Sequence, residues 1–157
     1  IFTHCHVDHI LGNNFVAKTW GLKPEIHKAG LQFLVNGQQQ GRIYGFEMDK
    51  NIEPENFIEE GDKIQFGNSE LQVVYTPGHA DGSICFICHP QKFVIVGDVL
   101  FRDSIGRTDF HTGDYDILMR SIHTKLFTLD DEFTVYSGHG PETTIGYEKV
   151  NNPFIRF

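Results

Sequence analysis

The sequence has few basic residues and no long apolar run, and both shortages exclude classes of partner. Thirteen Lys and Arg stand against 21 Asp and Glu, a formal net charge of −8. Nucleic acids and anionic membrane surfaces require clustered positive charge, so we expect neither as the main partner. No apolar run approaches the ~20 residues that cross a bilayer. The composition therefore indicates a protein with no membrane association and a small-molecule partner.

Cysteine is also scarce, and the three cysteines offer no disulfide framework. Their small number favours a reducing compartment, so we expect a cytoplasmic protein. Cys85 and Cys88 form a Cys-x-x-Cys-His string that formally matches a haem attachment or redox motif. The segment has the pattern of a strand, in which residues i and i+3 face opposite sides of a sheet. The two thiols therefore cannot converge, and we interpret them as structural.

The length suits one domain, residues 1–157, with an apolar core. Apolar residues at helical spacing predict helices over 11–20, 29–35, 115–126 and 144–150. Short β-type runs predict strands over 24–27, 63–66, 71–75, 84–87, 93–96 and 133–136. Residues 36–56 are predicted as a long irregular loop, in which Tyr44 and Phe46 either line a substrate entrance or pack in a solvated connector.

The densest chemistry lies at the start of the chain, in His4-Cys5-His6-Val7-Asp8-His9. At an extended strand end, His4 and His6 project to one side while Cys5 faces the other, and Asp8 and His9 follow at a turn. Imidazole nitrogens and carboxylate oxygens are ligands that zinc prefers, and catalytic zinc sites keep a position for water. A polar loop that happens to be rich in histidine is the alternative.

Three more candidate ligands recur downstream, each after a β-type run and a glycine. They are His79 in Thr-Pro-Gly-His, Asp98 in Val-Gly-Asp, and His139 in Ser-Gly-His. In α/β architectures such residues are delivered at the carboxyl edge of the sheet, where sites are built. We therefore expect all of these side chains to meet in one metal site.

With these motifs, the chain resembles the metallo-β-lactamase superfamily, and within it the glyoxalase II-like (hydroxyacylglutathione hydrolase-like) branch. The His-x-His-x-Asp-His signature and its spaced partners carry the resemblance over residues 1–157, and Gly-Arg-Thr-Asp-Phe at 106–110 is typical of the branch. It implies an α/β (α+β) fold, the αββα sandwich. Because the chain opens with Ile1 and reaches His4 at once, we expect a fragment that lacks the N-terminal strands of that fold.

The resemblance also implies the ligand set and the cofactor. His4, His6 and His79 would hold one metal, Asp8, His9 and His139 the other, and Asp98 would bridge them. Two divalent ions are expected, most often zinc, although the same nitrogen and oxygen ligands accept iron or manganese. Such a pair can bind a water between its ions and lower the pKa of that water towards 7. Asp8 is in addition the expected catalytic carboxylate.

The function implied is a metal-dependent hydrolase that uses a bridging hydroxide, with thioesters of the hydroxyacylglutathione type as substrates. Full glyoxalase II members carry a C-terminal helical region that grips glutathione, whereas this chain stops at Phe157, which leaves the substrate open. Arg107 and Asp109 are interpreted as an ion pair that braces a loop. Ser137 and Cys5 have no activating base that is not already a candidate ligand.

One competing interpretation is a mononuclear-iron persulfide (sulfur) dioxygenase, whose branch shares the same motifs. The ending Ser137-Gly138-His139-Gly140-Pro141 resembles the hydrolases more closely. A non-catalytic binding module is a third reading. For a chain of residues 1–157 alone, an uncovered apolar face is expected to cause self-association and to lower activity.

Overall fold

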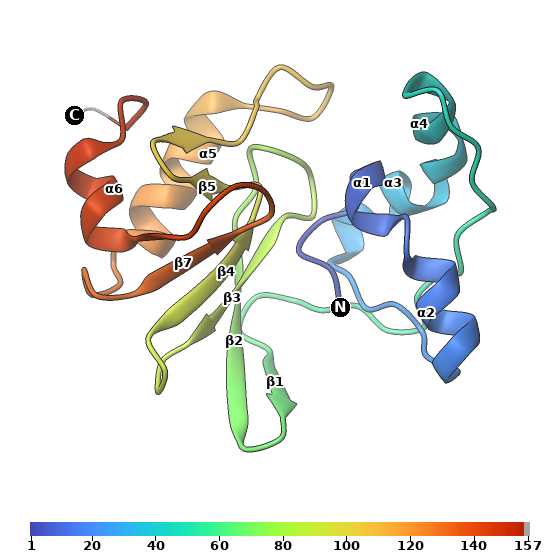
Figure 1. Cartoon of the computed structure of the whole chain (residues 1–157), viewed down its shortest axis with the longest axis horizontal. Helices are drawn as coiled ribbons and strands as arrows, with labels where there is room; N and C mark the ends of the chain where they lie inside the picture. Colours follow the sequence, from blue (N-terminus) through green and yellow to red (C-terminus); the bar gives the residue numbers. More distant parts are fainter. Residues whose placement is uncertain (156–157) are drawn as a thin grey trace.

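The computed structural model describes residues 1–155, and its central element is a six-stranded sheet of order β1-β2-β3-β4-β7-β8 (Figure 1). The strands are β1 (Lys63–Phe66), β2 (Ser69–Tyr75), β3 (Ile84–Cys88), β4 (Phe93–Gly97), β7 (Thr134–Ser137) and β8 (Thr143–Thr144). Strands β1 to β4 form an antiparallel meander, and β7 pairs with β4 in parallel. Strands β2, β4 and β7 therefore run the same way and end at the same edge.

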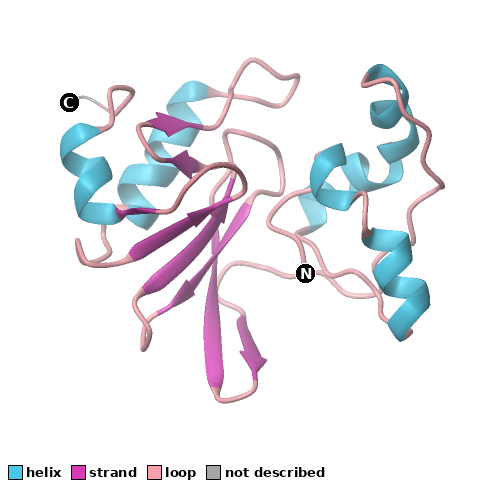
Figure 2. Ribbon diagram, in the orientation of Figure 1, coloured by secondary structure: helices cyan, strands magenta, loops and turns pink. Residues whose placement is uncertain are grey.

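One face of the sheet is covered by helices from the second half of the chain (Figure 2). These are α5 (Tyr115–Ser121), the π-helical turn η2 (Ile122–Leu126) that continues it, and α6 (Ile145–Asn151). Leu118, Ile122 and Leu126 are fully buried in a cluster that includes Val94 and Val135 of the sheet. The apolar stripe predicted for residues 115–126 thus packs against the sheet. Asp114 caps this helix, because its carboxylate accepts a hydrogen bond from Ile117 N at 2.9 Å.

A second group of helices lies beside the sheet and comes from the first third of the chain (Figure 1). It contains α1 (Val7–Ile10), α2 (Asn13–Trp20), η1 (Lys28–Gly30), α3 (Leu31–Val35) and α4 (Gly37–Ile43). Cys5, Ile10, Ile26 and Leu34 form its small core. The amide of Ile84 in β3 donates to the carbonyl of Thr3 at 2.8 Å, which fastens the N-terminal segment to the sheet.

The structure corrects several predicted elements. Residues 24–27 do not form a strand, and Ile26 makes only an isolated bridge to Phe57. The first residues of the chain are likewise not in a strand, and Asp8 and His9 lie in α1 rather than at a turn. The predicted loop 36–56 contains α4. Two further strands, β5 (Leu100–Phe101) and β6 (Ser104–Ile105), form a short hairpin that was not predicted.

Strand β3 confirms the interpretation of the Cys-x-x-Cys string. Cys85 lies in the apolar cluster on the helix-covered face of the sheet, and Cys88 lies in a different cluster with Phe86 and Leu71. All three cysteines are free and buried. The two thiols therefore cannot bind one haem or form one disulfide.

The architecture has the helix-covered sheet that the α/β (α+β) expectation requires. As expected for this sequence, residues 1–155 form one large sheet rather than both sheets of an αββα sandwich. Over the same residues, no helix combines the length and the apolar character needed to cross a membrane.

Candidate metal centre

Three of the candidate ligands come from the edge where β2, β4 and β7 end. Asp98 follows β4 and His139 lies just beyond β7, while His79 lies in the loop that leaves β2. The ends of β4 and β7 are held in register, because Gly138 N donates to Gly97 O at 2.7 Å. The parallel direction of these strands thus explains why residues 41 positions apart in the chain, Asp98 and His139, meet.

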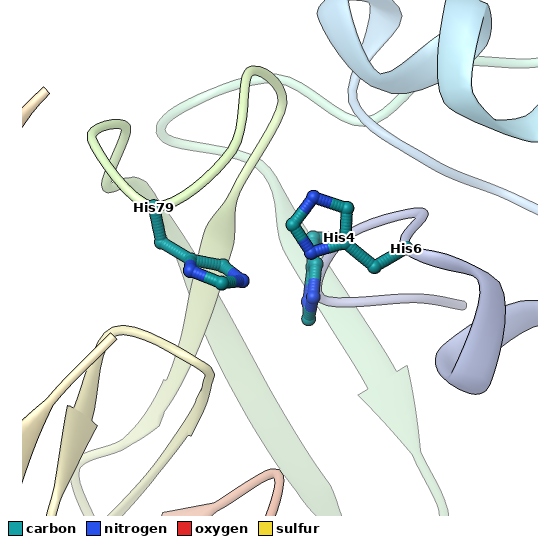
Figure 3. Close-up of side chains that lie close together, drawn as sticks. All are labelled: His4, His6 and His79. Atoms are coloured by element: carbon teal, nitrogen blue, oxygen red, sulfur yellow. The ribbon is translucent and has the colours of Figure 1, made fainter. Parts of the chain in front are cut away.

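The other four candidates come from the N-terminal segment that crosses this edge. His4 and His6 lie in its extended part, and Asp8 and His9 lie in the short helix α1. Figure 3 shows the rings of His4 and His6 facing His79 across a small gap. Cys5 lies between the two ligands but is buried in the apolar core beside Gly30, as the alternation predicts.

The seven side chains form three overlapping groups in which the candidate ligand atoms lie within 4.8 Å of one another. The groups are His4, His6 and His79; His4, His9 and Asp98; and Asp8, His9 and His139. Every residue that the sequence nominated as a ligand is therefore in the cluster. Of the His, Cys, Asp and Glu residues in the described chain, no others form such a group.

Asp98 occupies the middle of the cluster. Its Oδ1 lies 3.3 Å from His9 Nε2, and its Oδ2 lies 3.8 Å from His79 Nε2 and 3.5 Å from His139 Nε2. Asp8 completes the outer side, with Oδ2 3.0 Å from His139 Nε2 and 3.5 Å from His9 Nε2. The carboxylate of Asp98 thus lies close to His79 of the first group and to His9 and His139 of the third.

Several polar atoms of the cluster are buried without a hydrogen-bond partner. They are Nε2 of His4 and His79, together with His9 Nε2 and Asp98 Oδ1, which face each other at 3.3 Å without the alignment of a hydrogen bond. Such atoms are costly to bury unless something satisfies them. A metal ion would do so, because nitrogen and carboxylate oxygen donors that converge without protons between them are what a divalent ion requires. The donor set therefore fits the metal that the sequence predicts.

The pKa values of the imidazoles favour the neutral form that binds metal. Burial, reinforced by His9 and His6, lowers the pKa of His4 to about 2. Burial, reinforced by His79, lowers the pKa of His6 to about 4. Burial also lowers the pKa of His79 itself. At neutral pH these three rings keep a free nitrogen lone pair.

The carboxylates of Asp98 and Asp8 have the opposite effect, because they raise the pKa of a neighbouring imidazole. Burial lowers the pKa of His9, but the adjoining carboxylates of Asp98 and Asp8 outweigh that effect and raise it. Burial raises the pKa of Asp98, yet the neighbouring imidazoles outweigh it, so that the pKa lies below its ordinary value. Asp98 is therefore ionised at neutral pH and able to bind cations.

The loop that carries Arg107 orients His79, a role that the sequence did not indicate. The Nδ1–H of His79 donates to the carbonyl of Arg107 at 2.8 Å, which leaves Nε2 facing the cluster. The predicted ion pair is present, with Arg107 donating to both carboxylate oxygens of Asp109 at 2.9 and 2.8 Å. The same guanidinium lies 4.4 Å above the ring of Phe110, which contacts the rings of His6 and His79. The pair is exposed and braces the loop.

The cluster opens into a cavity of about 1030 Å³. Its walls are rich in aromatic side chains, namely Phe33, Tyr44, Phe46, Phe101 and Phe110. Tyr44 and Phe46 thus line the cavity, which favours the first of the two alternatives that the sequence left open, a role in a substrate entrance. Among the described residues, the arginines in the wall are Arg102 and Arg107, and the candidate ligands Asp8, Asp98 and His139 also line the cavity. A cavity of this size admits a substrate much larger than a small acyl group.

A helix-backed sheet with such a cluster at its carboxyl edge is typical of a metal-dependent enzyme, and the sequence identifies the class. The family model of the metallo-β-lactamase superfamily matches residues 1–139, and the chain belongs to that superfamily. Its members are mostly hydrolases that bind divalent metals, often two.

Individual relatives narrow the comparison. The chain is 37% identical over 162 residues to hydroxyacylglutathione hydrolase GloC of Haemophilus influenzae, a match that covers 99% of this chain and 74% of that protein. The fold is similar to that of TTHA1623, solved in a di-iron-bound form, with a TM-score of 0.89, 34% identity and coverage of 97% and 74%. It is also similar to BLEG-1, a B3 metallo-β-lactamase, with a TM-score of 0.88, 35% identity and coverage of 98% and 74%.

Proposed function

We propose that this protein is a thioester hydrolase with two divalent metal ions. In this proposal His4, His6 and His79 hold one ion, Asp8, His9 and His139 hold the other, and Asp98 bridges them. The observation that supports it best is the position of Asp98, whose two carboxylate oxygens face imidazoles from both groups. Seven ligands exceed the need of one tetrahedral ion but suit two ions that share a bridge.

Zinc is the first candidate for both positions, with iron and manganese as alternatives. The imidazole and carboxylate donors accept each of these metals, so the metal that is available in the cell helps to decide. The di-iron form of TTHA1623 keeps iron a serious candidate for this chain.

The bound ions would supply hydroxide at neutral pH and a Lewis acid for the thioester carbonyl. The protein's own contribution is to hold and orient the reactants. Asp8 lines the cavity and is half exposed, so its carboxylate is placed to hold the attacking water and to take its proton. When the carbon–sulfur bond breaks, the electron pair leaves with sulfur as a thiolate. No strong acid is needed, because a thiol has a pKa of about 8.5.

No side-chain nucleophile is required in this scheme. Burial raises the pKa of the Cys5 thiol to about 12, and Cys5 faces the apolar core. The hydroxyl of Ser137 donates to the carbonyl of Leu100 at 2.7 Å rather than to a base. The substrates we propose are thioesters of the hydroxyacylglutathione type, which is the activity in the name of the Haemophilus influenzae relative.

A second candidate, the mononuclear-iron persulfide dioxygenase, also has an observation in its favour. His4, His9 and Asp98 form a group of two imidazoles and one carboxylate within 4.8 Å. Two His and one carboxylate are the ligands of many non-haem iron oxygenases, which keep open positions for oxygen. A single iron could therefore occupy the centre of the cluster.

Metal analysis and two assays distinguish these candidates. Protein reconstituted with zinc, iron or manganese is analysed for metal content, then assayed for cleavage of a hydroxyacylglutathione and for oxygen uptake with glutathione persulfide. We expect close to two ions per chain, thioester cleavage and no oxygen uptake. One iron per chain with oxygen uptake would establish the dioxygenase. Metal binding with neither activity would refute both enzymatic proposals.

A further inference from the structure

The hairpin of β5 and β6 forms one wall of the cavity, and its turn carries Arg102. Phe101 precedes this residue, and its ring lies 6.4 Å from the ring of His139, a candidate ligand that also lines the cavity. Arg102 follows Phe101 in the turn and lines the cavity as well. A substrate that lies between the metal centre and this wall would therefore come close to Arg102.

The turn is fixed from behind by a buried carboxylate. Glu148 of α6 is fully buried and accepts hydrogen bonds from Asp103 N at 3.1 Å and from the Thr143 hydroxyl at 2.5 Å. The amide of Asn152 donates to Glu148 at 2.7 Å and to the carbonyl of Ser104 at 2.9 Å. A buried charge is costly unless its oxygens are satisfied. This network satisfies both oxygens and holds the two residues that follow Arg102.

The backbone at this turn is constrained as well. Asp103 has a φ of +57°, in the left-handed region that residues with a Cβ seldom adopt. Its side chain accepts a hydrogen bond from the Tyr147 hydroxyl at 3.0 Å. The guanidinium of Arg102 lies over the ring of the same Tyr147, 5.2 Å from its centroid. Backbone and side-chain contacts together orient Arg102 before any ligand binds.

The two arginines of the cavity wall differ in how well their charge is neutralised. Arg107 donates two hydrogen bonds to Asp109, so its guanidinium already has a carboxylate partner. Among the described residues, the closest carboxylate oxygen to Arg102 belongs to Asp103, at 3.9 Å from Nε, and that carboxylate also accepts a hydrogen bond from Tyr147. At that distance no hydrogen bond forms. The side chain of Arg102 also hydrogen-bonds to Tyr147, but a guanidinium has five N–H donors, so Arg102 keeps donors for an incoming anion.

We propose that Arg102 binds an anionic group of the substrate, such as a carboxylate, while an apolar arm of the same substrate packs on the aromatic wall. This inference rests on the thioesterase proposed above and names the residue that would select among its substrates. A guanidinium and a carboxylate can form two parallel hydrogen bonds, which provides orientation as well as affinity. The substrate class is an acyl thioester with a carboxylate on its thiol arm.

The test uses two thioesters that differ by one charge. They are the phenylacetyl thioesters of 3-mercaptopropionate and of its methyl ester, compared on metal-loaded protein. For Arg102→Gln, we expect KM for the carboxylate thioester to rise about tenfold or more, with kcat within about twofold, since a hydrogen-bonded ion pair of this kind contributes that much. The methyl ester should show little change, and Arg102→Lys should restore part of the loss. Arg120→Gln, an exposed arginine of α5 outside the cavity wall, is the control.

A second readout does not depend on turnover. Binding of the thioether 3-(phenethylthio)propionate to metal-free protein is measured by calorimetry, and Arg102→Gln should weaken it about tenfold, by the same argument. If wild-type protein hydrolyses neither of these thioesters nor a hydroxyacylglutathione, the proposed function fails, and the thioether still decides the role of Arg102. If both thioesters are hydrolysed and Arg102→Gln changes neither KM nor thioether binding, the anion site is refuted and the hydrolase stands.

Discussion

Asp98 is the residue on which the candidate centre depends most. Among the described residues, its carboxylate lies within 4 Å of imidazoles from α1, from the loop after β2 and from the end of β7. The carboxylate of Asp8 comes this close only to His9 and His139 within the same part of the chain. A bridging ligand serves both ions, so its loss should be felt at both positions. Loss of an outer ligand such as Asp8 should mainly affect one.

The first prediction is that Asp98→Asn lowers the occupancy of both ions. Because it removes a direct charged donor, the loss of affinity should exceed the about 10 to 100-fold that is typical of removing an outer partner. Metal content after dialysis against a graded chelator measures it. Asp116→Asn, an exposed acid in the first turn of α5, is the matched control and should keep two ions. A variant at Asp98 that loses one ion and retains the other at wild-type affinity would rule out the bridge.

The second prediction concerns the acid stability of the metal-free protein. The pKa values of His4 and His6 lie at about 2 and about 4 in the folded state, below the ordinary value of 6.5. Above pH 6.5 both rings are neutral in the folded and unfolded states and have no effect. Below pH 6.5 these two rings become protonated in the unfolded chain but stay neutral in the folded chain. The free energy of unfolding therefore falls by about 1.4 kcal/mol per pH unit for each ring.

Urea unfolding of chelator-treated protein at pH 7 and at pH 5 tests this prediction. His9 acts with the opposite sign, because its pKa is raised and its contribution is lost as the pH rises through the folded value. The measured change is therefore the net of these contributions. His89→Gln, which alters an exposed histidine outside the cluster, is the control. Equal unfolding free energies at the two pH values would contradict the buried neutral imidazoles.

At the scale of elements, the site requires close approach between strand ends. Gly138 follows β7, and a Cβ at this position would lie 2.2 Å from Asp98 Oδ1 and 2.8 Å from His9 Cε1. Any side chain here must displace two candidate ligands. The glycine in Ser-Gly-His is thus part of the site, although it binds nothing itself.

The third prediction is that Gly138→Ala weakens metal binding about tenfold or more, as a displaced partner of the ligands would, while the protein remains folded. Chelator competition measures affinity, and thermal unfolding of the metal-free protein checks the fold. Gly12→Ala is the control, because its backbone is in the ordinary right-handed region and nothing lies within 4 Å of the added carbon. Unchanged metal affinity in Gly138→Ala would contradict the prediction, because it would show that Asp98 and His9 can move away from the added carbon without loss of binding.

The predictability of the elements depended on how periodic they are. The run Leu71 to Tyr75 and the helical stripe at Leu118, Ile122 and Leu126 have strong periods, and both elements are found where predicted. The helix α4 was missed because glutamines and two glycines obscure its pattern. Gly37 is required there by packing, since a Cβ would lie 2.5 Å from Asn51 Nδ2, although glycine normally disfavours helices.

Helix α2 shows what periodicity cannot tell. Its apolar spacing predicts a helix that ends at Gly21, and Gly21 is indeed its left-handed cap, with φ +65°. The stripe itself, however, faces outward, and Asn13 and Ala17 are the residues that face inward. Asn13 is held there by a hydrogen bond from its amide to the carbonyl of Ile52 at 2.9 Å. A pattern identifies an apolar face but not the surface that covers it.

At the scale of the whole molecule, the candidate site was more predictable than its surroundings. All seven nominated residues meet. Three of them do so because β2, β4 and β7 share a direction, which the position of each residue after a β-type run indicated, and the other four arrive on the N-terminal segment that is fastened to β3. The hairpin with Arg102 and the buried Glu148 were not predicted, because two-residue strands have no period and a carboxylate in a helix resembles a solvated one. The sequence thus predicted which residues cluster, while the cavity walls depended on tertiary contacts.

The outward-facing stripe of α2 carries the last prediction. It comprises Phe15, Val16 and Trp20, with Leu11 before the helix and Leu22 beyond it, and all five are exposed. The ring centroids of Phe15 and Trp20 lie 5.9 Å apart, so these two side chains form one apolar surface. Burying apolar area contributes about 25 cal/mol per Å², and two aromatic side chains supply much of such an area.

We therefore predict that the chain of residues 1–157 associates with itself through this stripe. Size-exclusion chromatography with light scattering over a range of concentrations should show dimers or larger species. The double variant Phe15→Ser, Trp20→Ser should shift them towards monomer, because it removes the aromatic area that drives contact. Phe66→Ser is the matched control, since Phe66 is similarly exposed but belongs to β1. A wild-type chain that is monomeric at every concentration, or an equal shift with Phe66→Ser, would show that the stripe is not the contact surface.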